Sequence, residues 1–158
     1  MGFGADLKSK AGQTACFSSA GLAEGTNSAT IKIAAPNGLG IDFAIDGYAY
    51  HKADTDNISV TAHDAQADLT TCLYLVQITS GNTVSTKKGT EVLSADLSGG
   101  TAVLHWPEPD DGNCPIGGYK VATSGATFTN GTTDLGAGTV TDTYYNFVGG
   151  LPLGPVTS

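Results

Sequence analysis

The sequence predicts an all-β fold, an antiparallel β-sandwich or jelly-roll-like domain, on three observations. Short segments with alternating apolar residues recur along the chain, and turn-forming residues separate them every 8–12 positions. One segment, LTTCLYLVQI at 69–78, is apolar at odd and even positions alike, which is typical of a strand covered on both faces. Threonine and glycine are abundant, and threonine suits a pleated surface because its branched β-carbon is stiff.

The length of 158 residues fits one domain. Residues 1–28 have scattered Gly, Ser and Ala without an apolar period of two or 3.6 residues, so we expect an extended arm. Residues 29–150 form the predicted sandwich. Residues 151–158 carry two prolines that end strand pairing, and we expect an extended C-terminal tail there.

The first predicted strand is ATIKIA at 29–34, which ends at a Pro-Asn-Gly turn. The next segment, IDFAIDGYAYHK at 41–52, changes its apolar face at Gly47 if it is one strand. A hairpin with Asp46 and Gly47 as a two-residue turn removes this conflict, because Ile45 and Phe43 then oppose the tyrosines and share their face. NISVTA at 57–62 predicts another strand, and HDAQADL at 63–69 predicts one helical turn.

The segment 69–78 is the predicted central strand. Ser80, Gly81 and Asn82 then turn the chain into a second hairpin with TVSTKKG. Further strands are predicted at TAVLHWP (101–107), GGYKVATS (117–124), ATFTNG (126–131) and TVTDTYYNFV (139–148).

The charge distribution argues against nucleic-acid binding. Seven lysines, no arginine and 15 acids give a net charge of −8, divided evenly between the two halves of the chain. No basic surface is available to displace counterions from a phosphate backbone. No apolar run is long enough for a membrane helix, and the first residues lack the apolar stretch of a signal peptide, so no membrane partner is expected.

The sequence carries no motif for catalysis, a metal or a cofactor. Cys16, Cys72 and Cys114 lack metal-site spacing and are expected to be reduced thiols, with Cys72 as a small buried side chain. The histidines are isolated, and no serine has the glycines of a nucleophile elbow. The acids at 54–57 and 108–113 fail the calcium-loop pattern, which favours solvated turn carboxylates. We therefore expect a non-enzymatic protein.

Three runs of the chain resemble small virion structural proteins of tailed bacteriophages, of the capsid decoration or cement kind. These runs are TTCLYLVQITSGNTVSTKKGTEVL, LHWPEPDDGNCPIGGYKVATSGATFTNGTTDLGAG and TYYN, within residues 29–150. The resemblance implies a cofactor-free protein made in the bacterial cytoplasm that binds the capsid exterior and stabilises the assembled shell. It implies the major capsid protein as partner and a homo-oligomer, a trimer or dimer at a capsid symmetry axis.

Partner contacts are expected at the two ends of the chain, because segments without their own core gain order on a partner. An alternative is a carbohydrate- or receptor-binding β-sandwich module of a phage fibre, with Trp106 and Tyr145 among the rings that could stack on a sugar; a hydrolase is a third hypothesis. The expected contact residues are Phe3, Leu7, Phe17, Leu22, Leu151, Leu153 and Val156.

Overall fold

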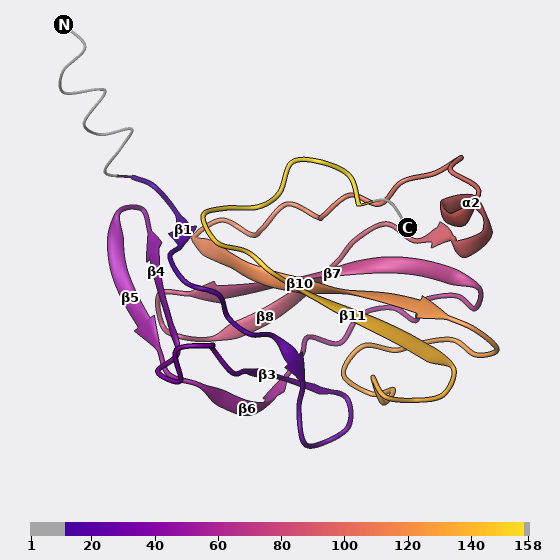
Figure 1. The fold of residues 1–158 in the computed structure, drawn as a ribbon, viewed down its shortest axis with the longest axis horizontal. Coiled ribbons are helices and arrows are strands. Elements are labelled where there is room, and N and C mark those ends of the chain that lie inside the picture. Colours follow the sequence, from indigo (N-terminus) through magenta and orange to yellow (C-terminus); the bar gives the residue numbers. More distant parts are fainter. Residues whose placement is uncertain (1–11, 157–158) are drawn as a thin grey trace, which may run out of the picture.

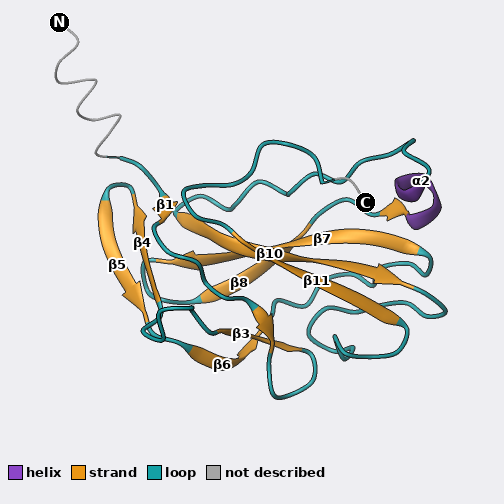
Figure 2. Cartoon of the chain, in the orientation of Figure 1, coloured by secondary structure: helices purple, strands orange, loops and turns teal. Residues whose placement is uncertain are grey.

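The computed structural model describes residues 12–156, which form antiparallel sheets packed against each other, as the sequence predicts (Figures 1 and 2). The largest sheet has the order β11-β10-β7-β8, and β9 pairs with β7 beside it. Two three-stranded sheets, β1-β4-β5 and β2-β3-β6, lie against it. The elements are β1 (Ala15–Cys16), β2 (Ala23–Glu24), β3 (Thr30–Ile33), β4 (Ile41–Ile45), β5 (Tyr48–Lys52), β6 (Thr55–Ser59), β7 (Thr70–Thr79), β8 (Val84–Lys88), β9 (Val92–Leu93), α2 (Ser94–Ser98), β10 (Asn113–Thr123) and β11 (Val140–Asn146).

The predicted hairpin at 41–52 is confirmed. Its register pairs Ile45 with Tyr48 and Phe43 with Tyr50, and the last two rings stack with centroids 5.6 Å apart. Asp46 and Gly47 have φ values of 51° and 83°, the left-handed conformations that a type I′ turn requires. The two-residue turn therefore fixes which side chains of β4 and β5 face the core.

The predicted central strand is confirmed as β7, where every residue from Thr70 to Ile78 is buried. Its even-numbered side chains, such as Tyr74, enter the core between the large sheet and the two small ones. Its odd-numbered side chains Leu73 and Leu75 enter a second cluster on the opposite face. The helix α2, a loop and the strip after β11 supply the other buried members of that cluster, which are Leu97, Leu104, Trp106 and Phe147.

Three local predictions are wrong. Residues 63–69 form no helical turn, because Gln66 is drawn into an antiparallel bridge with Phe128. Residues 101–107 and 126–131 are not strands, and each contributes only one bridging residue, Leu104 or Phe128. In both stretches the apolar residue anchors a loop over a sheet face. The helix α2 lies instead at 94–98, where its Leu97 enters the second cluster.

The described part of the predicted arm, residues 12–28, belongs to the sandwich. It contributes β1 and β2, and Cys16, Ala20 and Leu22 are core residues. Gly21, with φ of 57°, lets the chain pass very close to Ala34. A Cβ atom at position 21 would lie 2.0 Å from the Ala34 carbonyl oxygen. The segment is thus packed through backbone contacts and small side chains, which leave no apolar periodicity in the sequence.

Candidate partner-binding face

Segments near the two ends of the described chain pair with each other at Cys16 and Gly149. The Cys16 N–H donates to the Gly149 oxygen at 3.0 Å, and the Gly149 N–H donates to the Cys16 oxygen at 2.6 Å. This antiparallel bridge extends the β1-β4-β5 sheet by one strip of chain. In its register Phe17 and Val148 are the next facing pair, so they lie together on the surface of the sheet.

Three apolar side chains around this junction are exposed. Phe17 retains 57% of its possible exposure, Val148 63% and Leu153 90%. Apolar side chains that gather on one surface are typical of protein contact sites. We call the surface formed by residues 12–17, 108–113 and 147–153 the terminal face.

A cavity of about 410 Å³ opens on the terminal face. Thr14 lines it from the N-terminal side, and Gly150, Leu151 and Leu153 line it from the C-terminal side. The loop 108–113 and Pro115 complete the wall. The cavity thus combines apolar side chains with the acidic side chains of the loop.

Asp110 fixes the acidic loop to the large sheet. One carboxylate oxygen accepts from Lys87 Nζ at 2.8 Å and the other from Gln77 Nε2 at 2.6 Å, while the Asp110 N–H donates to Gln77 Oε1 at 2.8 Å. The Lys87 ammonium and the Gln77 amide hold the pKa of Asp110 below its usual range. The loop therefore presents Glu108 and Asp111, both exposed, in a fixed position.

The structure distributes the seven expected contact residues over several environments. Phe17 and Leu153 are exposed on the terminal face, and Leu151 is half-buried in the cavity wall. Leu22, 5% exposed, is a core residue and offers no surface for a partner. Val156 pairs with Leu104 and packs on the second cluster. Phe3 and Leu7 lie outside the described residues.

Sequence reasoning missed the contributions of Val148, Thr14 and the loop 108–113. Val148 follows the buried Phe147 and precedes two glycines, so the usual alternation along the strand places it outward. This alternation is the sequence signal from which the exposure of Val148 could have been predicted. The loop lies near the chain ends only through the pairing of β10 with β7, which no local pattern reports.

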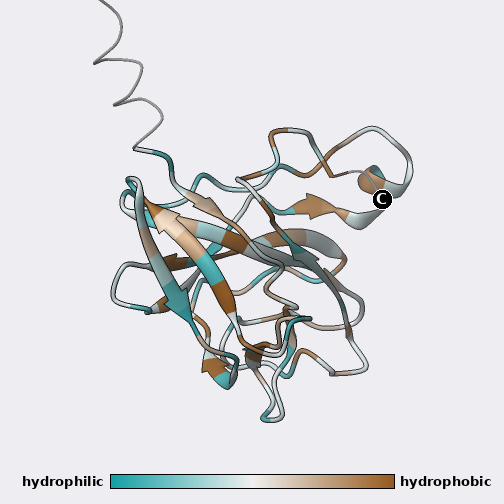
Figure 3. Cartoon of the chain, turned by 60° about the vertical axis from the view of Figure 1, so that its left-hand side comes forward, coloured by the Kyte–Doolittle hydropathy of each residue, from teal (hydrophilic) through white to brown (hydrophobic). Residues whose placement is uncertain are grey.

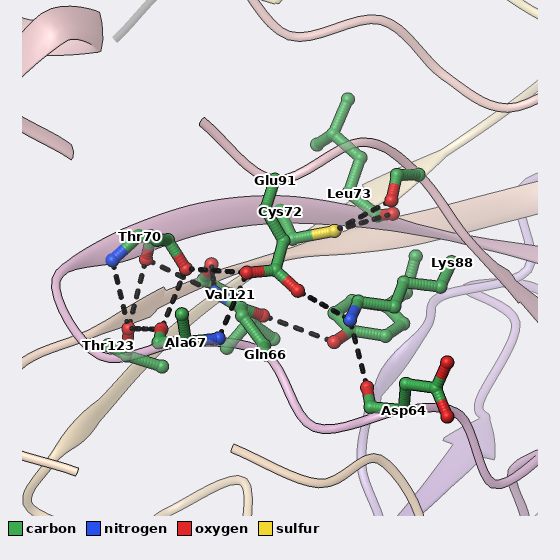
Figure 4. Close-up of polar contacts among 12 residues, drawn as sticks. Asp64, Gln66, Ala67, Thr70, Cys72, Leu73, Lys88, Glu91, Val121 and Thr123 are labelled. Carbon is green, nitrogen blue, oxygen red and sulfur yellow. Dashed lines mark hydrogen bonds and ion pairs between the residues drawn. The ribbon is translucent and has the colours of Figure 1, made fainter. Parts of the chain in front are cut away.

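The most extensive buried polar cluster surrounds Gln66 and is structural (Figure 4). Gln66 Nε2 donates to the carbonyl oxygens of Thr70 and Val121 at 3.1 and 3.0 Å, and Gln66 Oε1 accepts from the Tyr74 hydroxyl at 3.1 Å. Beside it, Lys88 and Glu91 form a half-buried ion pair. These groups satisfy one another, so the cluster fastens the loop 61–69 to the sheet and leaves no group aimed at a ligand.

The acids of residues 54–57 bind backbone groups. Asp54 Oδ1 accepts from the Ala35 N–H at 2.8 Å, and Asp56 Oδ1 accepts from the Thr26 N–H at 3.0 Å. Within residues 12–156, no three His, Cys, Asp or Glu side chains are arranged to hold a metal ion. The carboxylates here act as turn acceptors.

The cysteines are free and buried. Burial raises the pKa of Cys16 above its usual value and raises the pKa values of Cys72 and Cys114 to about 12. A thiol with such a pKa is protonated at neutral pH and is a poor nucleophile. Cys72 is the small buried side chain that the sequence predicts.

The aromatic rings considered for sugar stacking are largely packed. Trp106 is 7% exposed, and its ring meets those of Tyr145 and Phe147 edge to face, with centroids 5.5 and 5.0 Å apart. Stacking on a sugar needs an open ring face. Trp106 belongs to the second cluster and presents no such face.

The class of structure that the described residues define is an all-β sandwich. Comparisons of the chain with protein-family models, curated proteins and solved structures find no match. In the described part of the chain, no helix has the length and apolar character that crossing a membrane requires.

Proposed function

We propose that this chain is a non-enzymatic structural protein that binds the exterior of an assembled shell through the terminal face. The shell would be a tailed-phage capsid built from the major capsid protein, as the resemblance of the sequence implies. The observation that carries the proposal is the pairing of segments near both chain ends at Cys16 and Gly149. Phe17 and Val148 are exposed next to this pair, and the exposed Leu153 lines a cavity of about 410 Å³ that Thr14 and Gly150 also line.

The terminal face has the composition of a protein contact surface. Protein interfaces combine an apolar centre with a polar rim, and here exposed apolar side chains adjoin the carboxylates of Glu108 and Asp111. A partner that matches this surface offers apolar side chains and lysine or arginine side chains. A protein that binds only the assembled shell stabilises that shell by mass action.

The test is co-sedimentation of the purified protein with tailed-phage capsids that carry their accessory proteins and with capsids stripped of them. We expect binding to stripped capsids and at least roughly tenfold weaker binding for Phe17→Asp and Leu153→Asp, because each buries a charge in the apolar centre of the contact. Leu69→Asp is the matched control, because Leu69 is 61% exposed. Leu69 directly precedes β7, whereas the loop 108–113 lies near the C-terminal end of that strand.

Equal binding by all three variants and the unaltered protein would overturn the assignment of the contact to the terminal face. Absence of binding to any stripped capsid would overturn the proposed function. Binding of glycans on an array, lost in Tyr145→Ala, would favour the receptor-binding alternative instead.

A further inference from the structure

The outer edge of β5 is an open strand edge. β5 lies at the end of the sheet order β1-β4-β5, and within residues 12–156 no strand pairs with its other side. Figure 1 shows it as the outermost strand on the left, and Figure 3 turns it toward the viewer. An open edge presents unpaired backbone N–H and C=O groups, which favour pairing with another strand.

The pairing of β4 shows which groups of β5 point outward. The Phe17 N–H donates to the Asp42 oxygen at 2.8 Å, so Asp42 directs its backbone toward β1. Its neighbours Ile41 and Phe43 therefore direct theirs toward β5, where they oppose Lys52 and Tyr50. By the same alternation, Ala49 and His51 direct their N–H and C=O groups away from β4.

Other strand edges of the large sheet are protected. Along β8, Thr61 and Thr86 each donate a backbone N–H to the hydroxyl of the other at 3.1 Å. The loop 61–69 therefore covers that edge. Along β11, Asp142 lies near Glu24, whose pKa is raised by burial and by the adjacent Asp134 carboxylate. Crowded carboxylates at a strand edge discourage pairing with another copy.

The β6 edge is interrupted in a different way. Asn57 has φ of 56°, a left-handed residue in the middle of the strand, and its side chain accepts from the Asn27 N–H at 2.7 Å. β5 has no residue with positive φ and no crowded carboxylates along its edge. Its five residues, Tyr-Ala-Tyr-His-Lys, contain no proline and no carboxylate, although the chain has 15 acids.

We propose that β5 pairs antiparallel with β5 of a second copy, with Tyr50 on the two-fold axis. This register places Ala49 opposite His51 of the partner subunit, and both residues carry outward backbone groups. Each such pair exchanges two hydrogen bonds, and the two-fold axis generates the pair twice. The register follows from the backbone groups of β5, because only Ala49 and His51 direct their N–H and C=O groups away from β4.

The side chains fit the same register. Tyr48, 72% exposed, faces the partner's Lys52, so an ammonium lies beside an aromatic ring. The small Ala49 side chain leaves room for the imidazole opposite it. No two charged residues of like sign face each other across the axis, because Lys52 opposes a tyrosine and His51 an alanine.

The two sheets then become one continuous sheet, and residues that directly oppose each other share a face. Phe17 and Val148 of both copies therefore lie on the same side of the dimer. If the proposed function holds, the dimer is bivalent, and bivalent contact strengthens binding to a repetitive surface without any new contact. The interface itself does not depend on that function, because it lies at the opposite edge of the sheet.

Disulfide trapping tests the register. In Tyr48→Cys/Lys52→Cys, each new thiol opposes its counterpart in the partner at a non-hydrogen-bonded position, where the Cα separation of about 4.5 Å permits a disulfide. Within one copy the two positions are ~13 Å apart and cannot be bridged. The native cysteines are fully buried, so they do not compete.

We expect the double variant to form a covalent dimer under mild oxidation, while Tyr48→Cys and Lys52→Cys alone stay uncoupled at the same protein concentration. Covalent dimer at equal yield in the single variants would overturn the register. No dimer in any variant, together with a monomeric unaltered protein over the whole accessible concentration range in light scattering, would overturn the proposal.

A backbone variant tests the hydrogen bonds independently. Ala49→Pro removes the outward N–H from each copy and leaves the β4 bonds intact, so we expect dimer dissociation to be favoured roughly 30-fold. Ala49→Thr retains the N–H and is the control. Circular dichroism verifies that both variants fold. Unchanged dimerisation of a folded Ala49→Pro would place the interface elsewhere and overturn the proposal.

Discussion

β7 and β5 are both antiparallel strands with aromatic side chains, yet one is buried on two faces and the other is half-buried on one. All of β7 from Thr70 to Ile78 is buried, whereas only alternate residues of β5 are even partly covered. In Figure 3, where β5 is turned forward, hydrophilic colour marks the arrowhead end of β5. The difference lies in what covers each strand. The second face of β7 is covered by α2, the loop through Leu104 and Trp106, and the strip through Phe147.

The comparison teaches that this sandwich obtains its second core cluster from irregular chain. Leu97, Leu104 and Phe147 come from a short helix, a loop and the strip after β11, and they pack in one cluster with Leu73 and Leu75. Leu73 and Leu75 are fully buried at that face, although irregular chain and a short helix cover it. The following variants test this difference, beginning with the largest expected effect.

Leu75→Ala removes a fully buried side chain from the second cluster. We expect the free energy of unfolding to fall by about 3 kcal/mol, because the lost burial and the residual cavity add. Denaturant unfolding measures it. Leu93→Ala, at a 54% exposed leucine on β9, is the control and should cost less than about 0.5 kcal/mol. Equal costs would mean that the loops cover β7 only loosely.

Gln66→Leu preserves the approximate volume at the centre of the buried polar network but removes its hydrogen bonds. The Tyr74 hydroxyl and the Val121 carbonyl then lose their partner, and we expect a loss of about 2 kcal/mol in the free energy of unfolding. Thermal unfolding measures it. Tyr74→Phe in the same background should then cost little, since its hydroxyl is already unpaired. A full additional cost would show that the two residues are uncoupled.

Glu91→Gln tests the half-buried ion pair beside that network. Hydrogen bonds from Lys88 and the Ala67 N–H outweigh burial and lower the pKa of Glu91. A lowered folded-state pKa stabilises the protein above the unfolded-state value, and this contribution disappears as the pH falls through the folded-state value. We expect a cost of about 1 kcal/mol at neutral pH that vanishes in acid. Glu108→Gln, at an exposed acid, is the control and should change the free energy of unfolding by less than about 0.5 kcal/mol at neutral pH.

Asp42→Asn alters the hydrogen bond between Asp42 and His51 on the outer surface of the β1-β4-β5 sheet. Asp42 Oδ1 lies 2.8 Å from His51 Nδ1, but the side chains are 63% and 52% exposed. Solvent screens such a pair, so we expect a change below about 0.5 kcal/mol in the unfolding free energy. Chemical denaturation at low and high salt measures it. A change as large as that of Glu91→Gln would show that this surface is covered in solution.

Local chemistry predicted the hairpins and the central strand because each depends on residues close in sequence. Asp46 and Gly47 fix the β4–β5 register through the backbone conformations they permit, and the apolar run of β7 requires cover on both faces. The strand predictions at 101–107 and 126–131 failed for a related reason. An apolar residue that anchors a loop has the same sequence pattern as one that alternates in a strand.

The candidate site could be predicted only in part. Phe17 and Leu153 are apolar residues in segments without strand periodicity, and both are exposed on the terminal face. Leu22 has the same sequence character, yet its side chain lies against Gly117, where a glycine Cβ would meet it at 2.5 Å. Composition does not distinguish these two fates, because the space that Leu22 fills is created by a residue far along the chain.

The sequence by itself determined the all-β class, the turn positions and the strand buried on both faces, since these follow from backbone preferences and alternation over a few residues. Only the tertiary structure decided that segments near the two chain ends pair through Cys16 and Gly149, and that the loop 108–113 lies beside them. It also decided that no strand among residues 12–156 pairs with the outer edge of β5. These features depend on contacts between distant segments, whose free energy comes from packing and shared hydrogen bonds that no short window of sequence contains.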